Sequence, residues 1–290
     1  MSEPIIFYDI PGKHPKYKGW SPNTWKTRYA LAFKGLPFKT EWVEYPDIES
    51  VSKELGVNPT GTKKDGSPLY TLPLIYDPNT KTTVVDSLEI ARYLDKAYPD
   101  APALFPKNTR TLQTAFLAAI GAIVMGPLFT TIILATCNNL NPRSAEYFRS
   151  TREDLFGKKL EEHVPEGGEG TKRWKETQEA FNKLASWLDA NEGSGAFVMG
   201  ETISYADIDI ASRLIWTKIV LGEDSNEWGR FKIWNDGRWD QFLKSLEKNA
   251  RRRLKHIFAQ NDTCQHSEVT KQTYNAENIL TFQCSVYDLV

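Results

Sequence analysis

The chain is 290 residues long, about twice the size of a typical domain, which excludes a single small fold and predicts two domains. Its 40% hydrophobic content excludes global disorder, and its net charge of −1 gives no basic excess of the kind that nucleic-acid-binding proteins carry. Three cysteines and four histidines, widely scattered, predict neither a disulfide framework nor a metal site and favour a reducing, cytoplasmic environment.

The N-terminal part predicts a β-α-β unit. Residues 3–10 contain the β-favouring run IIFY, and residues 38–44 predict a second strand. Between them, residues 22–34 carry apolar side chains at helical spacing and end at Gly35, a residue typical of helix C-termini. A helical crossover of this kind makes the two strands parallel.

A hairpin and a further helix are expected next. The runs 74–76 and 82–85 flank the sequence DPNT, which suits a type I turn, and residues 86–98 have the apolar spacing of a helix. Three prolines between residues 98 and 106 exclude a helix or a central strand there. We therefore predict a domain boundary in this segment.

The remaining chain has helical period to about residue 254. Residues 115–137 carry no charge and are long enough to cross a membrane. Glycines, a proline and threonines inside this segment favour instead a buried core helix that is kinked or broken near Pro127, and membrane insertion is the alternative. The predicted organisation is a mixed α/β domain over 1–98, a proline-rich linker over 99–108, an all-helical domain over 109–254 and a disordered extension over 255–290.

Ser21 lies where the first predicted strand leads into the first helix. The unpaired N–H groups and the positive dipole end of a helix stabilise an anion, such as a thiolate, at this position. Ser21 followed by Pro22 also fits a structural N-cap, because serine is favoured at the cap and proline at the next residue. Both roles remain open.

Two later segments could contact a peptide-like ligand. A cis bond between Leu72 and Pro73 would direct the Leu72 backbone toward an extended peptide, whereas an ordinary trans proline is the alternative. Asp86 and Ser87 begin a helix with the pattern of a capping box, and the same geometry could bind the charged ends of an amino acid. A second capping box, at Ser204 and Asp207, is interpreted as structural.

In their order along the chain, these signals resemble the soluble glutathione transferases. The matching features are the serine at the first helix, the proline that opens the third strand, the Asp-Ser pair, the proline linker and the later motif G-x-x-I-S-x-A-D. The stretch WSPNTWKTRYALAFKGLPF is similar to the serine-type branch that includes fungal FuA-class enzymes and bacterial lignin β-etherases.

The resemblance implies a thioredoxin-like domain that binds glutathione and a helical domain that supplies a hydrophobic co-substrate site. It implies that Ser21, assisted by Asn23, activates the thiol, that Leu72 before a cis Pro73 pairs with the cysteinyl backbone, and that Asp86 and Ser87 hold the γ-glutamyl end. It also implies a homodimeric detoxifying transferase, without a metal, that attacks hydrophobic, aromatic electrophiles or ethers.

The hydrophobic site and the glycyl end of glutathione are less sharply defined. Lys63 and Lys64 are the candidates for the glycyl carboxylate. An apolar wall could instead make the protein a ligand-binding protein for small aromatic molecules with little catalysis. The predicted hydrophobic-site residues are Trp20, Phe116, Ile120, Met125 and Phe129.

Overall fold

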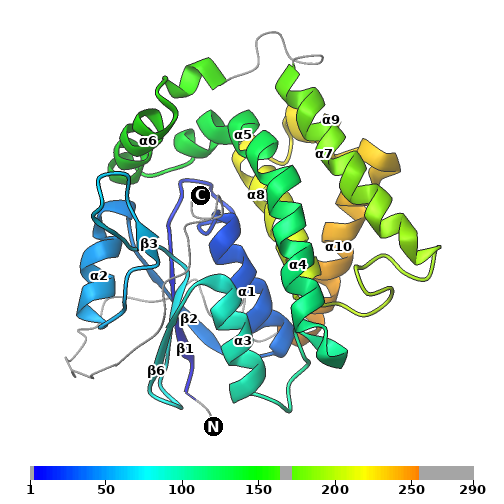
Figure 1. Ribbon diagram of the computed structural model, residues 1–290, viewed down its shortest axis with the longest axis horizontal. Helices are drawn as coiled ribbons and strands as arrows, with labels where there is room; N and C mark the ends of the chain where they lie inside the picture. The colour runs from blue at the N-terminus through cyan, green and yellow to red at the C-terminus, as the bar shows by residue number, and fades with distance from the viewer. Residues whose placement is uncertain (1–2, 164–171, 255–290) are drawn as a thin grey trace.

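The computed structural model describes residues 3–163 and 172–254, and the predicted extension over 255–290 lies outside them. An N-terminal α/β domain is followed by a larger group of helices (Figure 1). This confirms the predicted fold class, a thioredoxin-like domain followed by a helical domain.

The N-terminal domain is built on a four-stranded mixed sheet with the strand order β2-β1-β5-β6. The pair β1 and β2 is parallel, as predicted, and β5 is antiparallel to both β1 and β6. Side chains of β1 alternate between buried and half-buried, as a strand with one face on the core requires. The strands are β1 (Ile5–Asp9), β2 (Phe38–Trp42), β5 (Leu74–Asp77) and β6 (Thr82–Val85).

Helices cover both faces of this sheet. The helices α1 (Pro22–Lys34) and α3 (Ser87–Ala97) lie on one face, and α2 (Ile48–Glu54) lies on the other (Figure 1). Helix α1 ends as predicted at Gly35, whose φ of 67° is the left-handed conformation that glycine adopts without a steric penalty.

Two small features of this domain were not predicted. They are α2 and a short antiparallel hairpin of β3 (Gly61–Thr62) and β4 (Pro68–Leu69). Strands of two residues carry no measurable periodicity, and one helix of seven residues shows fewer than two turns of apolar spacing.

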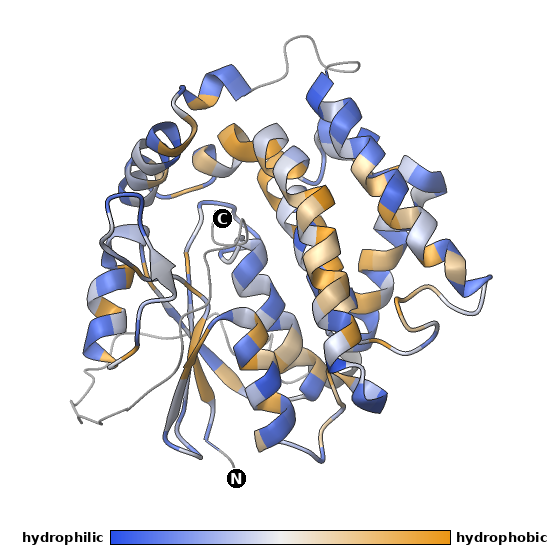
Figure 2. Cartoon of the chain, viewed as in Figure 1, coloured by the Kyte–Doolittle hydropathy of each residue, from blue (hydrophilic) through white to orange (hydrophobic). Residues whose placement is uncertain are grey.

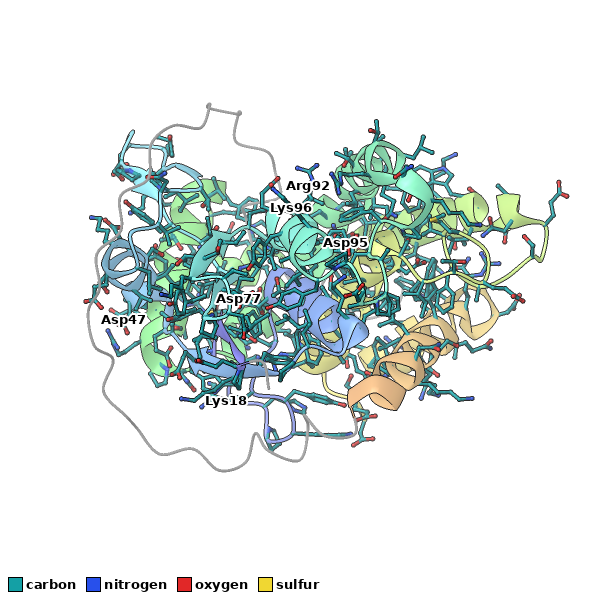
Figure 3. The ribbon with its side chains drawn as sticks, turned by 90° about the horizontal axis from the view of Figure 1, so that it is seen from below. Lys18, Asp47, Asp77, Arg92, Asp95 and Lys96 are labelled. Atoms are coloured by element: carbon teal, nitrogen blue, oxygen red, sulfur yellow. The ribbon has the colours of Figure 1, made fainter. Side chains whose placement is uncertain are left out.

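The linker is fixed to the N-terminal domain by Asp95. This carboxylate, on α3, accepts hydrogen bonds from the backbone N–H groups of Leu104 and Phe105 at 2.9 and 3.0 Å. It also pairs with the buried Lys34 of α1 at 2.9 Å. Figure 3 shows Asp95 on the same helix as Arg92 and Lys96. The start of the second domain is therefore held at the ends of α1 and α3.

Among its described residues, the second domain is built from helices and contains no strand longer than an isolated β-bridge. Hydrophobic residues are concentrated along its central helices, whereas α6 and α7 are more hydrophilic (Figure 2). Helix α8 packs along α1, so the two domains share a contact of two helices. The helices of the second domain are α4 (Arg110–Ile120), α5 (Gly126–Asn138), α6 (Pro142–Phe156), α7 (Lys172–Leu188), α8 (Tyr205–Leu221), α9 (Asn226–Lys232) and α10 (Trp234–Leu254).

The segment around Pro127 was predicted to be a core helix that is kinked or broken there, and in the structure this helix is not broken. Helices α4 and α5 join through a π-helical segment, Gly121–Met125, into one helix from Arg110 to Asn138. The wider π turn precedes Pro127, whose ring and missing N–H a regular α-helix does not accommodate. Among the described residues, this helix alone is long and apolar enough to cross a membrane, a test that core helices also pass, and 56% of its most apolar window is buried.

The capping box predicted at the start of α8 is present. The backbone N–H of Ser204 donates to the Asp207 carboxylate at 2.8 Å, and the N–H of Val198 donates to it at 2.7 Å. Asp207 is fully buried, and burial raises the pKa of its carboxyl to about 6. This structural interpretation of the motif is confirmed.

Candidate functional site

Ser21 occupies the N-cap position of α1, but its side chain makes no capping hydrogen bond. The residue is 1% exposed, and its hydroxyl finds no hydrogen-bond partner among the described residues. Leaving a buried hydroxyl unpaired costs about 1–3 kcal/mol, so such a group in a native protein needs an explanation. The structural N-cap hydrogen bond is not formed, and the Ser21 hydroxyl stays unpaired among the described residues.

The surroundings of Ser21 favour a negative charge. Helix α1 has no acidic residue in its first turn, and its positive dipole end begins beside the Ser21 hydroxyl. Asn23, two residues further on, is half-buried, and its Oδ1 accepts a hydrogen bond from Lys26 at 3.1 Å. An anion next to Ser21 would therefore meet the helix N-terminus, with the Asn23 carboxamide in the same turn.

The bond between Leu72 and Pro73 is cis, one of the two conformations that the sequence left open. The carbonyl of Pro73 accepts from the backbone N–H of Asp86 at 3.2 Å, which joins this segment to the start of α3. Within residues 3–163 and 172–254, no backbone hydrogen bond uses the N–H or C=O of Leu72. The Leu72 backbone thus retains both of its groups for an extended peptide.

Asp86 and Ser87 lie at the N-terminus of α3. Oδ1 of Asp86 accepts from the backbone N–H groups of Leu88 and Glu89 at 2.8 and 3.0 Å, so the structural N-cap is formed here. The backbone of Asp86 has a φ of 77°, which non-glycine residues adopt uncommonly and which is often found at functional sites. Asp86 is exposed and Ser87 is 7% exposed, so charge and hydroxyl lie side by side at a helix start.

Helix α8 reaches this second helix start from the other domain. Tyr205, its first residue, is 1% exposed. Burial raises the pKa of the Tyr205 phenol well above its usual value, and the nearby negative charges of Asp86 and Asp209 raise it further. The helical domain therefore lies against the turn that carries Asp86 and Ser87.

The predicted hydrophobic-site residues are mostly packed in the core. Trp20, Ile120 and Phe129 are exposed by 0, 0 and 2%, respectively. Met125 is 5% exposed, and Phe116 is half-buried with its ring 5.8 Å from that of Trp187. The structure does not gather these side chains on one open wall, and their role toward a co-substrate remains a prediction.

The lysines suggested for the glycyl carboxylate form ion pairs of their own. Lys63 pairs with Glu49 at 3.3 Å, and Lys64 lies 4.0 Å from Asp154 with both side chains largely exposed. Their predicted role remains untested. Within the described part of the chain, no group of three or more His, Cys, Asp or Glu residues could hold a metal ion.

A buried group of charges near Ser21 was not predicted. Lys26 of α1 pairs with Asp209 of α8 at 3.1 Å, and Asp209 also pairs with Arg213 at 2.9 Å. A partial signal for this group was present, because Lys26, Asp209 and Arg213 are charged residues on α1 and α8, two helices whose other residues are mostly buried. Nothing in the spacing showed that these residues would meet.

Comparisons with known proteins agree with this arrangement. Residues 20–97 match the family model of the glutathione S-transferase N-terminal domain, and residues 111–248 match that of the C-terminal domain. The glutathione S-transferase-like protein ustS of Aspergillus flavus is 34% identical over 232 residues, which cover 74% of this chain and 80% of that protein.

Two solved fungal structures are similar over most of the chain. The glutathione transferase GSTFuA3 from Phanerochaete chrysosporium is 46% identical, with a TM-score of 0.81, over 86% of this chain and 98% of that one. The glutathione S-transferase CsGST63524 of Ceriporiopsis subvermispora, solved in complex with glutathione, is 49% identical, with a TM-score of 0.81, over 85% and 98% of the two chains.

Proposed function

This chain belongs to the glutathione S-transferase family and resembles its fungal FuA class, and we propose that it activates the thiol of glutathione at Ser21. The observation that carries the proposal is the buried hydroxyl of Ser21, which has no partner among the described residues and lies at the start of α1. A relative that is 49% identical was solved with glutathione, which supports the same ligand here.

In this proposal, the hydroxyl of Ser21 donates a hydrogen bond to the sulfur, and the thiol proton leaves to solvent. A free cysteine thiol has a pKa of about 8.5. A hydrogen bond to a charged group contributes about 1.5–3 kcal/mol and a helix N-terminus about 0.3–1 kcal/mol, and about 1.4 kcal/mol corresponds to one pKa unit. Ser21 and the helix together can therefore lower the thiol pKa by about one to two.

The remainder of glutathione would bind across the two helix starts. The N–H and C=O of Leu72, which make no backbone hydrogen bond among the described residues, suit the cysteinyl backbone, and Asp86 with Ser87 suits the γ-glutamyl ammonium and carboxylate. The resulting thiolate would form a carbon–sulfur bond with a hydrophobic, aromatic electrophile or ether, and the displaced group would leave. We propose a detoxifying role in the cytoplasm for this reaction.

Replacing Ser21 tests the proposal. In Ser21→Ala, we expect the pKa of the bound thiol to rise by about one or more and turnover near neutral pH to fall at least tenfold, because the thiolate loses its hydrogen-bond donor. The affinity for glutathione should change little, since the peptide contacts remain. The measurements are the pH dependence of thiolate absorbance and of kcat, and an unchanged pH profile would refute the role of Ser21.

A ligand-binding role without catalysis receives no support from the predicted apolar wall, because Ile120, Met125 and Phe129 are buried. Retention on a glutathione-affinity column followed by a turnover assay separates the two functions. A retained protein that forms no conjugate with any generic electrophile would favour binding alone.

A further inference from the structure

A buried charge cluster, formed by Lys26 of α1 with Asp209 and Arg213 of α8, joins the two domains near the start of α1. Nζ of Lys26 lies 3.1 Å from Oδ1 of Asp209 on α8 and donates to Oδ1 of Asn23 at 3.1 Å. Asp209 accepts two further hydrogen bonds from Arg213, at 2.9 and 3.2 Å. The side chains of Lys26, Asp209 and Arg213 are only 8, 2 and 3% exposed.

The carboxyl of Asp209 keeps its negative charge in the fold. Burial alone would raise the pKa of the Asp209 carboxyl, but the neighbouring Arg213 and Lys26 hold it below its usual value. Buried ion pairs are costly to desolvate, and packed apolar side chains of similar volume often serve stability equally well. Stability is therefore a weak explanation for a lysine that reaches from α1 into the other domain at this point.

The buried charge cluster also contacts Asn23, and this contact fixes which end of the Asn23 carboxamide faces Lys26. Asn23 lies in the first turn of α1, two residues after Ser21, and side chains of a helix point toward its N-terminus. A carboxamide has one accepting oxygen and one donating nitrogen, whereas an ammonium group can only donate. Lys26 therefore selects the oxygen of Asn23, and the amino group of Asn23 is turned away from Lys26.

We propose that Lys26, held by Asp209, is a positioning residue that orients the Asn23 carboxamide so that its amino group donates to the sulfur of glutathione. This inference rests on the proposed function. Because Asp209 belongs to the helical domain, that domain supplies more than a co-substrate surface: it completes the thiol-binding site of the N-terminal domain through Lys26.

The buried charge cluster also contacts the π-helical segment Gly121–Met125. Nη1 of Arg213 donates to the sulfur of Met125 at 2.9 Å, and Met125 is the last residue of that segment. The long helix therefore contacts Arg213, which contacts Asp209, which in turn pairs with Lys26.

The test compares Lys26→Met with a matched control, Lys34→Met. Both lysines lie on α1, both side chains are buried, and each pairs with an aspartate of another helix, at 3.1 Å for Lys26 and 2.9 Å for Lys34. We expect both variants to lower the Tm. Only Lys26→Met should raise the pKa of enzyme-bound glutathione, by about 0.5 to 1, since one weak donor to the sulfur is lost. An equal rise in Lys34→Met would overturn the proposal.

A double-variant cycle separates orientation from direct electrostatics. If Lys26 acts through Asn23, Lys26→Met should have no further effect on the thiol pKa in an Asn23→Ala background. A full additional effect in that background would show that the ammonium acts on the sulfur directly, against the proposal. Because Asn23 is half-buried, Asn23→Ala should fold even if Lys26→Met does not, and an unchanged thiol pKa in Asn23→Ala would also overturn it.

The wild-type protein distinguishes the inference from the function on which it rests. If glutathione bound to the wild type titrates like free glutathione, the proposed activation of the thiol fails. If the wild type lowers the thiol pKa and Lys26→Met leaves it equally low, only the positioning role fails.

Discussion

Ser21 and Asp86 occupy the same kind of position, the N-cap of a helix, and use it differently. Oδ1 of Asp86 accepts two backbone hydrogen bonds at the start of α3, whereas the hydroxyl of Ser21 makes none at the start of α1. A short hydroxyl and a carboxylate both suit the cap in sequence. The hydrogen-bond partners, and not the sequence motif, distinguish the capping side chain of Asp86 from the unpaired hydroxyl of Ser21.

Two variants of Asp86 separate its capping role from ligand binding. Asp86→Asn keeps a side-chain oxygen for the cap and tolerates the φ of 77°, but it loses the negative charge. We expect the KM for glutathione to rise roughly tenfold, at a Tm near that of the wild type, because one charge-assisted hydrogen bond to the ammonium is weakened. Asp86→Ala should in addition lose about 1 kcal/mol of stability.

The measurements for this pair are steady-state kinetics and thermal unfolding. If Asp86→Asn had the KM of the wild type, Asp86 would be a structural cap only. The comparison is informative because the two variants share the loss of charge and differ in the cap.

At the scale of elements, the first turn of helix α8 contains a buried carboxyl group, that of Asp207, which makes the stability of the fold depend on pH. The pKa of the Asp207 carboxyl is raised by burial to about 6 in the folded protein, against the usual 3.8. Between these values the folded state holds a proton that the unfolded state has released, so stability from this group is present at low pH and is lost as pH rises toward 6.

Asp207→Asn should remove this dependence. Relative to Asp207→Asn, the wild type should lose about 3 kcal/mol of its free energy of unfolding between about pH 4 and pH 6, because a shift of about two pKa units corresponds to that energy. Chemical denaturation of both proteins at several pH values measures the difference. Parallel stability curves would contradict the raised pKa.

On the scale of the whole molecule, the long helix from Arg110 to Asn138 leaves an apolar face uncovered. Leu112 is 72% exposed, and Ala115, Ala118 and Ala122 on the same helix are also exposed. Figure 2 shows the hydrophobic colouring of α4 and α5. The family resemblance implied a homodimer, and a second copy of this chain would bury such a face.

We therefore expect the protein to be a dimer that Ala118→Glu converts to a monomer at micromolar concentration, because a charge would be buried in the contact. Leu155→Glu, at a 43% exposed position on α6, is the control and should leave the dimer intact. Light scattering coupled to gel filtration measures both. A monomeric wild type that binds lipid vesicles would instead support the membrane alternative.

Much of the architecture was accessible from local patterns. The parallel pair of β1 and β2, the hairpin of β5 and β6, the end of α1 at Gly35 and the capping box of α8 all follow from the spacing of neighbouring residues. The short elements α2, β3 and β4 escaped prediction because they contain too few residues to repeat a pattern.

The sequence by itself determined the alternation of strands and helices and placed Ser21, Asp86 and Ser87 at helix starts, because turn, cap and period are set by residues within a few positions of each other. Only the tertiary structure decided that Ser21 makes no cap and that Lys26 meets Asp209. Those outcomes depend on how α1 and α8 pack. The spacing of apolar residues indicates which face of a helix is buried, but it does not indicate which residues pack against that face.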